Sequence, residues 1–137
     1  MSLSHLNNLI IEFYDKLSSW EQSVVKETGY SLAQIHTVEV LGAHGSMRMK
    51  ELADRLGITT GTLTVQVEKL VTAGLLERHP HQEDRRSILV GLTDEGKKLH
   101  NAHHHLHLQL TNDLAQHLSD TEIQVLQSCL DKMVREF

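Results

Sequence analysis

Residues 49–78 read MKELADRLGITTGTLTVQVEKLVTAGLLER, and this stretch decides the fold. Its apolar residues recur at the spacing of an amphipathic helix on both sides of a tight turn. Gly57 can end the first helix, and Thr59 can cap the N-terminus of the second. Gly74 is the predicted end of the second helix. The stretch therefore predicts two helices that pack against each other across a three-residue turn.

A β-hairpin is predicted directly after this helical pair. Residues 75–78 and 87–92 are short β-like runs, and the polar stretch 79–84 between them contains Pro80, the one proline of the chain. A hairpin that follows a helix-turn-helix is a wing. The predicted fold class is therefore mainly α-helical with a small β-hairpin, a winged helix-turn-helix.

Further helices are predicted on both sides of the winged unit. Residues 5–26, 31–41, 94–117 and 119–134 carry apolar side chains at helical spacing. The expected caps and ends of these helices are the capping boxes Ser31/Gln34 and Ser119/Glu122, the cap Thr93, and the glycines Gly29, Gly42 and Gly45.

Composition narrows the class of protein. A net charge of −5 argues against a protein that coats nucleic acid by bulk electrostatics, but it permits a sequence-specific binder with locally placed Lys and Arg. The lone cysteine, Cys129, excludes an internal disulfide. No apolar stretch reaches the ~18 residues that a membrane span needs, so we expect a soluble, cytoplasmic protein. No HExxH motif, Ser/His/Asp ordering or phosphate-cradling glycine loop is present, so we do not expect an enzyme.

The second helix of the pair is the predicted recognition helix. Its inward stripe leaves the opposite face exposed near the helix N-terminus, where hydroxyl groups can donate to phosphates or base edges. Val65 can contact a thymine methyl, and the helix N-terminal amides can bind a phosphate. The predicted DNA-binding residues of this helix are Thr59, Thr60, Gly61, Thr62, Thr64, Val65, Gln66 and Lys69.

Residues 84–96, DRRSILVGLTDEG, resemble the wing signature of the MarR family of bacterial regulators. The helical pair resembles that family's helix-turn-helix in spacing and residue class, and the flanking helices also fit a MarR protomer. The resemblance implies that Arg86 reaches into the minor groove of double-stranded DNA, where a narrow groove favours arginine. It implies that Asp84 orients the wing and that Arg85 adds positive charge.

The resemblance also implies an organisation and partners. Residues 1–137 are expected to form one MarR-like domain, with a dimerisation part at 1–30 and 94–137 and the winged helix-turn-helix at 31–93. The implied partners are a pseudo-palindromic operator and a second copy of the chain, joined through the N- and C-terminal helices. Many family members carry an arginine where this chain has Val65. We therefore expect operator recognition to depend more on wing contacts and DNA shape than on base contacts made by the recognition helix.

Histidines indicate what the regulator senses. The chain has 11, and five of them lie within eight consecutive positions. Two histidines four apart on a helix share a face and can bind one metal ion. His103 and His107 meet this condition, and His100 and His104 meet it on a neighbouring stripe. The best candidate for a further ligand from another element is His36.

The pattern also resembles the zinc-responsive AdcR/ZitR branch of the MarR family. Counted from the Leu-Thr-Asp of the wing, His103 and His107 match two metal ligands of that branch. Counted from the glutamine of the second helix, His36 matches a third. The fourth ligand is a glutamate late in the first helix, for which Glu21 is the better match and Glu27 the alternative. The resemblance implies one principal zinc site per protomer.

The predicted function is a transcriptional repressor whose DNA affinity is controlled by zinc bound between the first two helices and the long fifth helix. By the resemblance, its targets are zinc-uptake genes. One alternative replaces zinc by a small aromatic or phenolic ligand. Another is a thiol redox sensor that uses Cys129, although the apolar pattern around this residue predicts a buried packing role.

Overall fold

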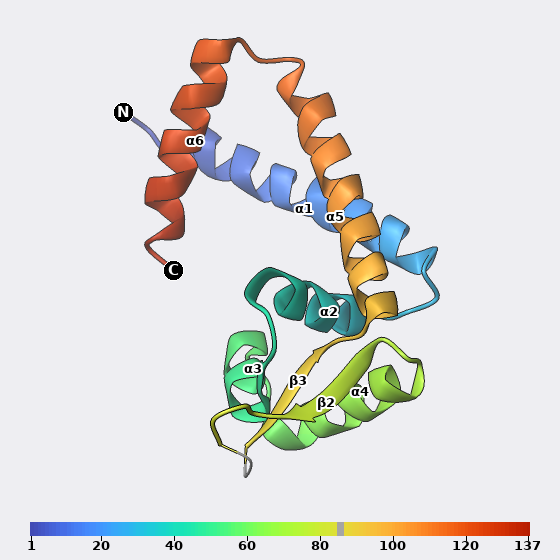
Figure 1. Cartoon of the computed structure of the whole chain (residues 1–137). Coiled ribbons are helices and arrows are strands. Elements are labelled where there is room, and N and C mark those ends of the chain that lie inside the picture. Colours follow the sequence, from blue (N-terminus) through green and yellow to red (C-terminus); the bar gives the residue numbers. More distant parts are fainter. Residues whose placement is uncertain (85–86) are drawn as a thin grey trace. The chain divides into compact units, whose positions relative to one another are not determined.

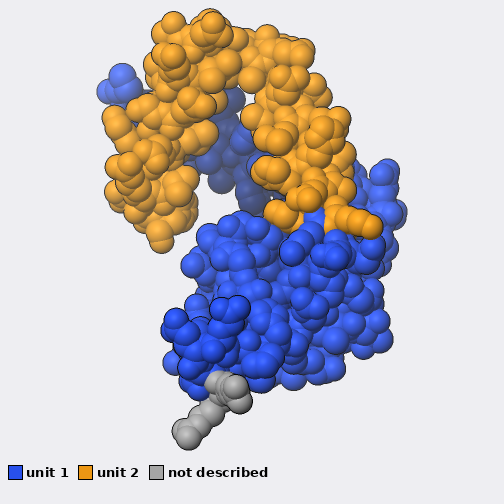
Figure 2. All heavy atoms as spheres, viewed as in Figure 1, with its two compact units in different colours: residues 1–97 blue, residues 98–137 orange. Residues whose placement is uncertain are grey.

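The computed structural model describes residues 1–84 and 87–137. Its elements are α1 (Ser4–Lys26), α2 (Leu32–His44), β1 (Met47–Arg48), α3 (Met49–Leu56), α4 (Thr60–Thr72), β2 (Leu76–Pro80), β3 (Ile88–Leu92), α5 (Asp94–Ala115) and α6 (Asp120–Val134) (Figure 1). They confirm the predicted fold class, mainly helical with a small antiparallel wing. Two compact units comprise residues 1–97 and 98–137 (Figure 2). No helix among the described residues has the length and apolarity that crossing a membrane requires.

The wing is a three-stranded antiparallel sheet with the order β1-β3-β2. Strand β1 was not predicted, and it pairs Met47 with Val90 of β3. Pro80 is also a correction to the prediction, because it ends β2 opposite Ile88 instead of lying in the hairpin tip. A proline is tolerated there because β2 is an edge strand of this sheet, with one side unpaired.

The core of the first unit lies between the helices of the winged part and the sheet. The predicted inward stripe of α4 is confirmed, since Leu63, Val67 and Leu70 are completely buried. Further fully buried side chains come from α2, α3, β2 and β3; they are Ile35, Thr37, Val38, Leu52, Leu76 and Val90. Burial of these side chains fixes the face of α4 that turns inward, and so the face that stays outside.

The predicted helix ends are largely confirmed. Ser31 and Gln34 form the expected capping box at the start of α2. Gly57 ends α3 in the left-handed conformation, with φ of 68°, where a glycine carries no Cβ penalty. Gly42 does not end a helix, which corrects the prediction: α2 continues to His44, and the glycine at positive φ is Gly45. An isolated glycine is tolerated inside a helix whose apolar face is buried.

The junction between the wing and α5 explains the spacing of Thr93 and Gly96. The Thr93 hydroxyl donates to the Gly74 carbonyl at 2.6 Å and accepts from the Gly96 N–H at 3.0 Å. The Thr93 N–H donates to the carbonyl of Leu75 at 3.0 Å. A Cβ at position 96 would overlap this same Leu75 oxygen. Threonine therefore caps α5 as predicted, and glycine is required three residues later by close packing.

A capping box at the start of α6 couples helix stability to pH. The Ser119 N–H donates to the Glu122 carboxylate at 2.9 Å, and the Ser119 hydroxyl accepts from the Glu122 N–H at 3.1 Å. The backbone hydrogen bond from Ser119, and then its side chain, lower the pKa of Glu122 below its usual value. A lowered folded-state pKa stabilises the fold above the unfolded-state pKa, and this contribution is lost as the pH falls through the folded-state pKa.

We predict that Ser119→Ala lowers the free energy of unfolding by about 1 kcal/mol at pH 7, because α6 loses its cap. The loss should be smaller at pH 3, because the contribution from the lowered pKa of Glu122 is lost as the pH falls. Ser31→Ala is the matched control, because Gln34, the capping-box partner of Ser31, does not titrate. The loss in free energy of unfolding caused by Ser31→Ala should therefore not depend on the charge of a carboxylate. Urea unfolding of both variants at the two pH values checks this. The prediction is contradicted if the loss in free energy of unfolding changes with pH in the same way for Ser119→Ala and for Ser31→Ala.

Candidate nucleic-acid interface and metal-binding histidines

The N-terminal half of α4 presents an exposed polar face. Gly57, Ile58 and Thr59 form the turn from α3, and Thr59 caps α4 by accepting from the Thr62 N–H at 3.2 Å. Val65 is 57% exposed. The other predicted DNA-binding residues of α4 that are exposed are Thr60, Gly61, Thr62, Thr64 and Lys69. This face is free of core contacts because the opposite stripe is buried.

Hydroxyl groups on this face are partly engaged within the helix. Thr59 donates to the Thr62 hydroxyl at 3.1 Å, and Thr64 donates to the Thr60 carbonyl at 2.8 Å. As an acceptor in the first pair, the Thr62 hydroxyl retains its proton for a phosphate or base edge. Thr64 can still accept through its oxygen. The cap thus orients the first turn of α4 as well as starting it.

Gln66 departs from the expected exposed position. Its side chain is half-buried, and its Oε1 accepts a long hydrogen bond of 3.4 Å from the Thr37 hydroxyl of α2. Gln66 therefore lies at the edge of the exposed face, next to the core. The sequence pattern did not reveal this contact, because its partner is 29 residues earlier.

Asp84 and Ser87 of the wing are joined by two hydrogen bonds. The Ser87 hydroxyl donates to the Asp84 carboxylate at 3.1 Å, and the Ser87 N–H donates to the Asp84 carbonyl at 3.0 Å. These bonds give a structural role to the aspartate and the serine of the wing signature, residues 84–96. The predicted DNA-binding residues Arg85 and Arg86 lie outside the described residues.

An ion pair connects the wing to the outer face of α4. Arg78 of β2 contacts Glu68 of α4 at 2.6 Å, with the two side chains 34% and 59% exposed. An exposed pair contributes little to stability, about 0–1 kcal/mol. Its geometric effect is to tie strand β2 to the candidate recognition helix. Sequence reasoning missed it, because periodicity within each element carries no signal for a contact between elements.

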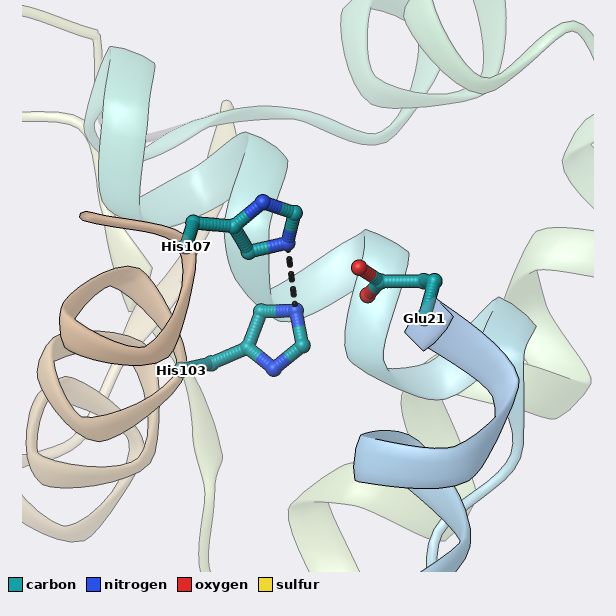
Figure 3. A group of neighbouring side chains, drawn as sticks. All are labelled: Glu21, His103 and His107. Atoms are coloured by element: carbon teal, nitrogen blue, oxygen red, sulfur yellow. Dashed lines mark hydrogen bonds between the residues drawn. The ribbon is translucent and has the colours of Figure 1, made fainter. Parts of the chain in front are cut away.

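His103 and His107 lie one turn apart on α5 and approach each other closely. Their Nε2 atoms are 3.2 Å apart, and the ring centroids are 4.8 Å apart at an interplanar angle of 67° (Figure 3). His103 is only 3% exposed, and His107 is half-buried. Two nitrogens bound at ~2.0–2.1 Å to one tetrahedral ion lie roughly 3.3–3.4 Å apart. The pair therefore has nearly the separation that shared zinc ligation requires.

The other predicted ligands belong to the first unit. Glu21 is half-buried on α1, and it is the third side chain drawn in Figure 3. The alternative, Glu27, is exposed just after the last residue of α1. His36 is exposed on α2. Each of the three side chains ends in a donor that zinc accepts, a carboxylate oxygen or an imidazole nitrogen.

Cys129 is exposed on α6, which corrects the predicted packing role. The apolar side chains around it on this helix, Val125, Leu126, Leu130 and Met133, are also exposed, by 44–56%. An apolar periodicity shows which residues share a face, but it does not show what covers that face.

Comparison with known proteins places the winged unit and the flanking helices in one family. Residues 30–88 match the MarR family. The transcriptional regulator PecS of Dickeya dadantii is 30% identical over 132 residues, which cover 96% of this chain and 77% of PecS. The chain belongs to the MarR family. This is a family of transcriptional regulators and not of enzymes, as the sequence predicted.

Solved MarR-family structures share the fold. The reduced form of MarR from E. coli is 27% identical, with a TM-score of 0.70 and coverage of 97% of this chain and 96% of that one. FabT of Streptococcus pneumoniae, solved in complex with DNA, has a TM-score of 0.86 at 22% identity, with coverage of 98% and 96%. The matches of this MarR chain to three Bacillus subtilis regulators span less than half of those proteins, 43%, 46% and 47% of their length.

Proposed function

We propose that this MarR-family chain is a dimeric DNA-binding transcriptional repressor whose affinity for its operator is controlled by zinc. The observation that carries the DNA-binding part is the exposed N-terminal face of α4, held by the Thr59 cap and by the buried stripe behind it. A helix presented in this way fits a major groove, with its first turns against the base edges. FabT, a structural neighbour, is solved in complex with DNA, and MdtR of Bacillus subtilis, a relative, is a transcriptional repressor.

The second copy in the proposed dimer would cover apolar faces on the terminal helices. On α1 the exposed apolar side chains include Leu6, Leu9, Ile10 and Phe13, each 43–54% exposed. The apolar face of α6 around Cys129 is exposed to a similar degree. A dimer is also what a pseudo-palindromic operator requires, because each half-site binds one recognition helix about 34–36 Å from the other.

Zinc is the proposed effector because of the donor set. The proposed ligands Glu21, His103 and His107 supply one carboxylate and two imidazoles, which are ligands that zinc accepts. His36 supplies a further imidazole, and we propose it as the fourth ligand on the resemblance to the zinc-responsive branch. Ligands drawn from α1, α2 and α5 would make the separation of the two recognition helices depend on metal occupancy. By the same resemblance, the proposed targets are zinc-uptake genes.

The wing arginines provide the test of the DNA-binding part. We predict that Arg85→Ala with Arg86→Ala weakens binding to a duplex that the wild-type chain selects from a random pool in the presence of zinc. Loss of two cationic contacts per protomer, four in the dimer, should reduce the slope of log affinity against log salt by about 3.6. Fluorescence anisotropy over a salt series measures both quantities.

The matched control removes the same charge elsewhere in the first unit. Lys16→Ala with Lys26→Ala on the exposed surface of α1 should leave the salt slope within error of the wild type. If both double variants behave alike, the wing arginines do not contact DNA.

A further inference from the structure

A second histidine pair lies on α5 outside the proposed zinc site. His100 and His104 are four residues apart, with ring centroids 6.0 Å apart and ring planes inclined by 22°, so the two imidazoles are stacked. His100 is half-buried and His104 is exposed. Both belong to the second unit, and neither is among the ligands proposed for the repressor function.

We propose that His100 and His104 bind a second divalent transition-metal ion, distinct from the ion at His103 and His107. Side chains at this spacing lie on one face of a helix, one turn apart. Imidazole suits zinc, copper and nickel, and the remaining positions on the ion can be filled by water at the exposed His104. The rings can turn their nitrogens onto one ion because rotation about the bond to the imidazole is soft.

The two pairs are neighbours on the same helix. His100 and His103 are three residues apart, as are His104 and His107, so the four imidazoles form one continuous patch at helical spacing. Two divalent cations bound this close repel each other. Two factors weaken binding of the ion at His100 and His104: it has only two protein ligands, and it is repelled by the neighbouring ion. Its affinity is therefore lower than that of the ion at His103 and His107, and it fills at higher metal concentration.

His105 provides a control within the same histidine-rich run. Its neighbours four residues away are Asn101 and Gln109, and its Nε2 lies 3.2 Å from the Gln109 side-chain nitrogen. It has no imidazole one turn away in either direction. A single exposed histidine of this kind tests whether any loss of binding comes from chelation or from imidazole content alone.

The test is a titration of the metal-free full-length chain with zinc ion alone, read as ions bound per protomer by calorimetry and equilibrium dialysis. We expect two ions for the wild type and one, the tighter, for His100→Ala with His104→Ala. His100→Gln with His104→Gln should show the same loss while retaining side-chain bulk. His103→Ala with His107→Ala should retain one weaker ion, and His105→Ala should bind two.

Two results would overturn the second site. One is an undiminished stoichiometry in both His100/His104 variants, and the other is an equal loss in His105→Ala. The proposal does not rest on zinc control of DNA binding. A His103/His107 variant that keeps the tighter ion would overturn the repressor's proposed zinc site and leave the His100/His104 result to be judged by its own variants.

Discussion

Replacing His103 and His107 together by alanine should abolish the zinc dependence proposed for DNA binding. In the wild type, a coupling of ~1–3 kcal/mol would change DNA affinity about 5–150-fold between zinc and chelator. In the variant this ratio falls to one, because the two nitrogens 3.2 Å apart on α5 are removed. Anisotropy with the selected duplex, in zinc buffer and in chelator, measures the ratio.

The ratio is the readout because His103 is buried, and its replacement can also lower stability. A destabilised variant still gives a ratio above one if zinc acts elsewhere. His105→Ala, on the same helix, should respond to zinc like the wild type. If the double variant keeps the full wild-type response, the ligands of the effector are not these two histidines.

Gly96→Ala should destabilise the fold by about 1–3 kcal/mol or more, the cost of forcing extra atoms into a packed site. The added methyl would overlap the backbone carbonyl oxygen of Leu75, which already accepts from the Thr93 N–H. A backbone oxygen held in this way cannot rotate aside as a flexible side chain can. Urea unfolding followed by circular dichroism measures the change in the free energy of unfolding.

Gly61→Ala is the matched control and should have the opposite sign. The atom nearest to a Cβ at this helical position is the Thr59 hydroxyl oxygen, at 3.9 Å, which is ordinary contact. Alanine in place of glycine at such a site stabilises by about 0.4–1 kcal/mol. The prediction for Gly96 is wrong if both variants unfold with the free energy of the wild type.

Local signals in the sequence predicted most of the fold. Ser31, Thr59 and Ser119 cap their helices as expected, because a cap is a contact within three residues. Strand β1 has only two residues, too few for any periodicity, and it forms through pairing with β3 some 40 residues later along the chain. The helical role of Gly42 likewise depends on burial of the α2 face, which local propensity does not encode.

In the candidate site, too, features within one helix were predicted from the sequence, and contacts between elements were not. The spacing of His103 and His107 predicted a pair on one face of a helix, and the structure brings their nitrogens together. The spacing did not give the half-buried position of Gln66 beside Thr37, or the Arg78–Glu68 ion pair. These contacts join elements whose packing is set by the whole core. Exposure of Cys129 was mispredicted because the apolar pattern of α6 does not show what covers that face.

The proposed control of DNA affinity by zinc is tested most directly by measuring the thermodynamic linkage between zinc binding and DNA binding. The affinity of the wild-type chain for the selected duplex is measured at buffered free zinc and in chelator, and the zinc affinity is measured with and without the duplex. We expect zinc to tighten DNA binding and the duplex to tighten zinc binding by the same factor, about 5–150-fold. A DNA affinity that is identical with zinc and with chelator would contradict it.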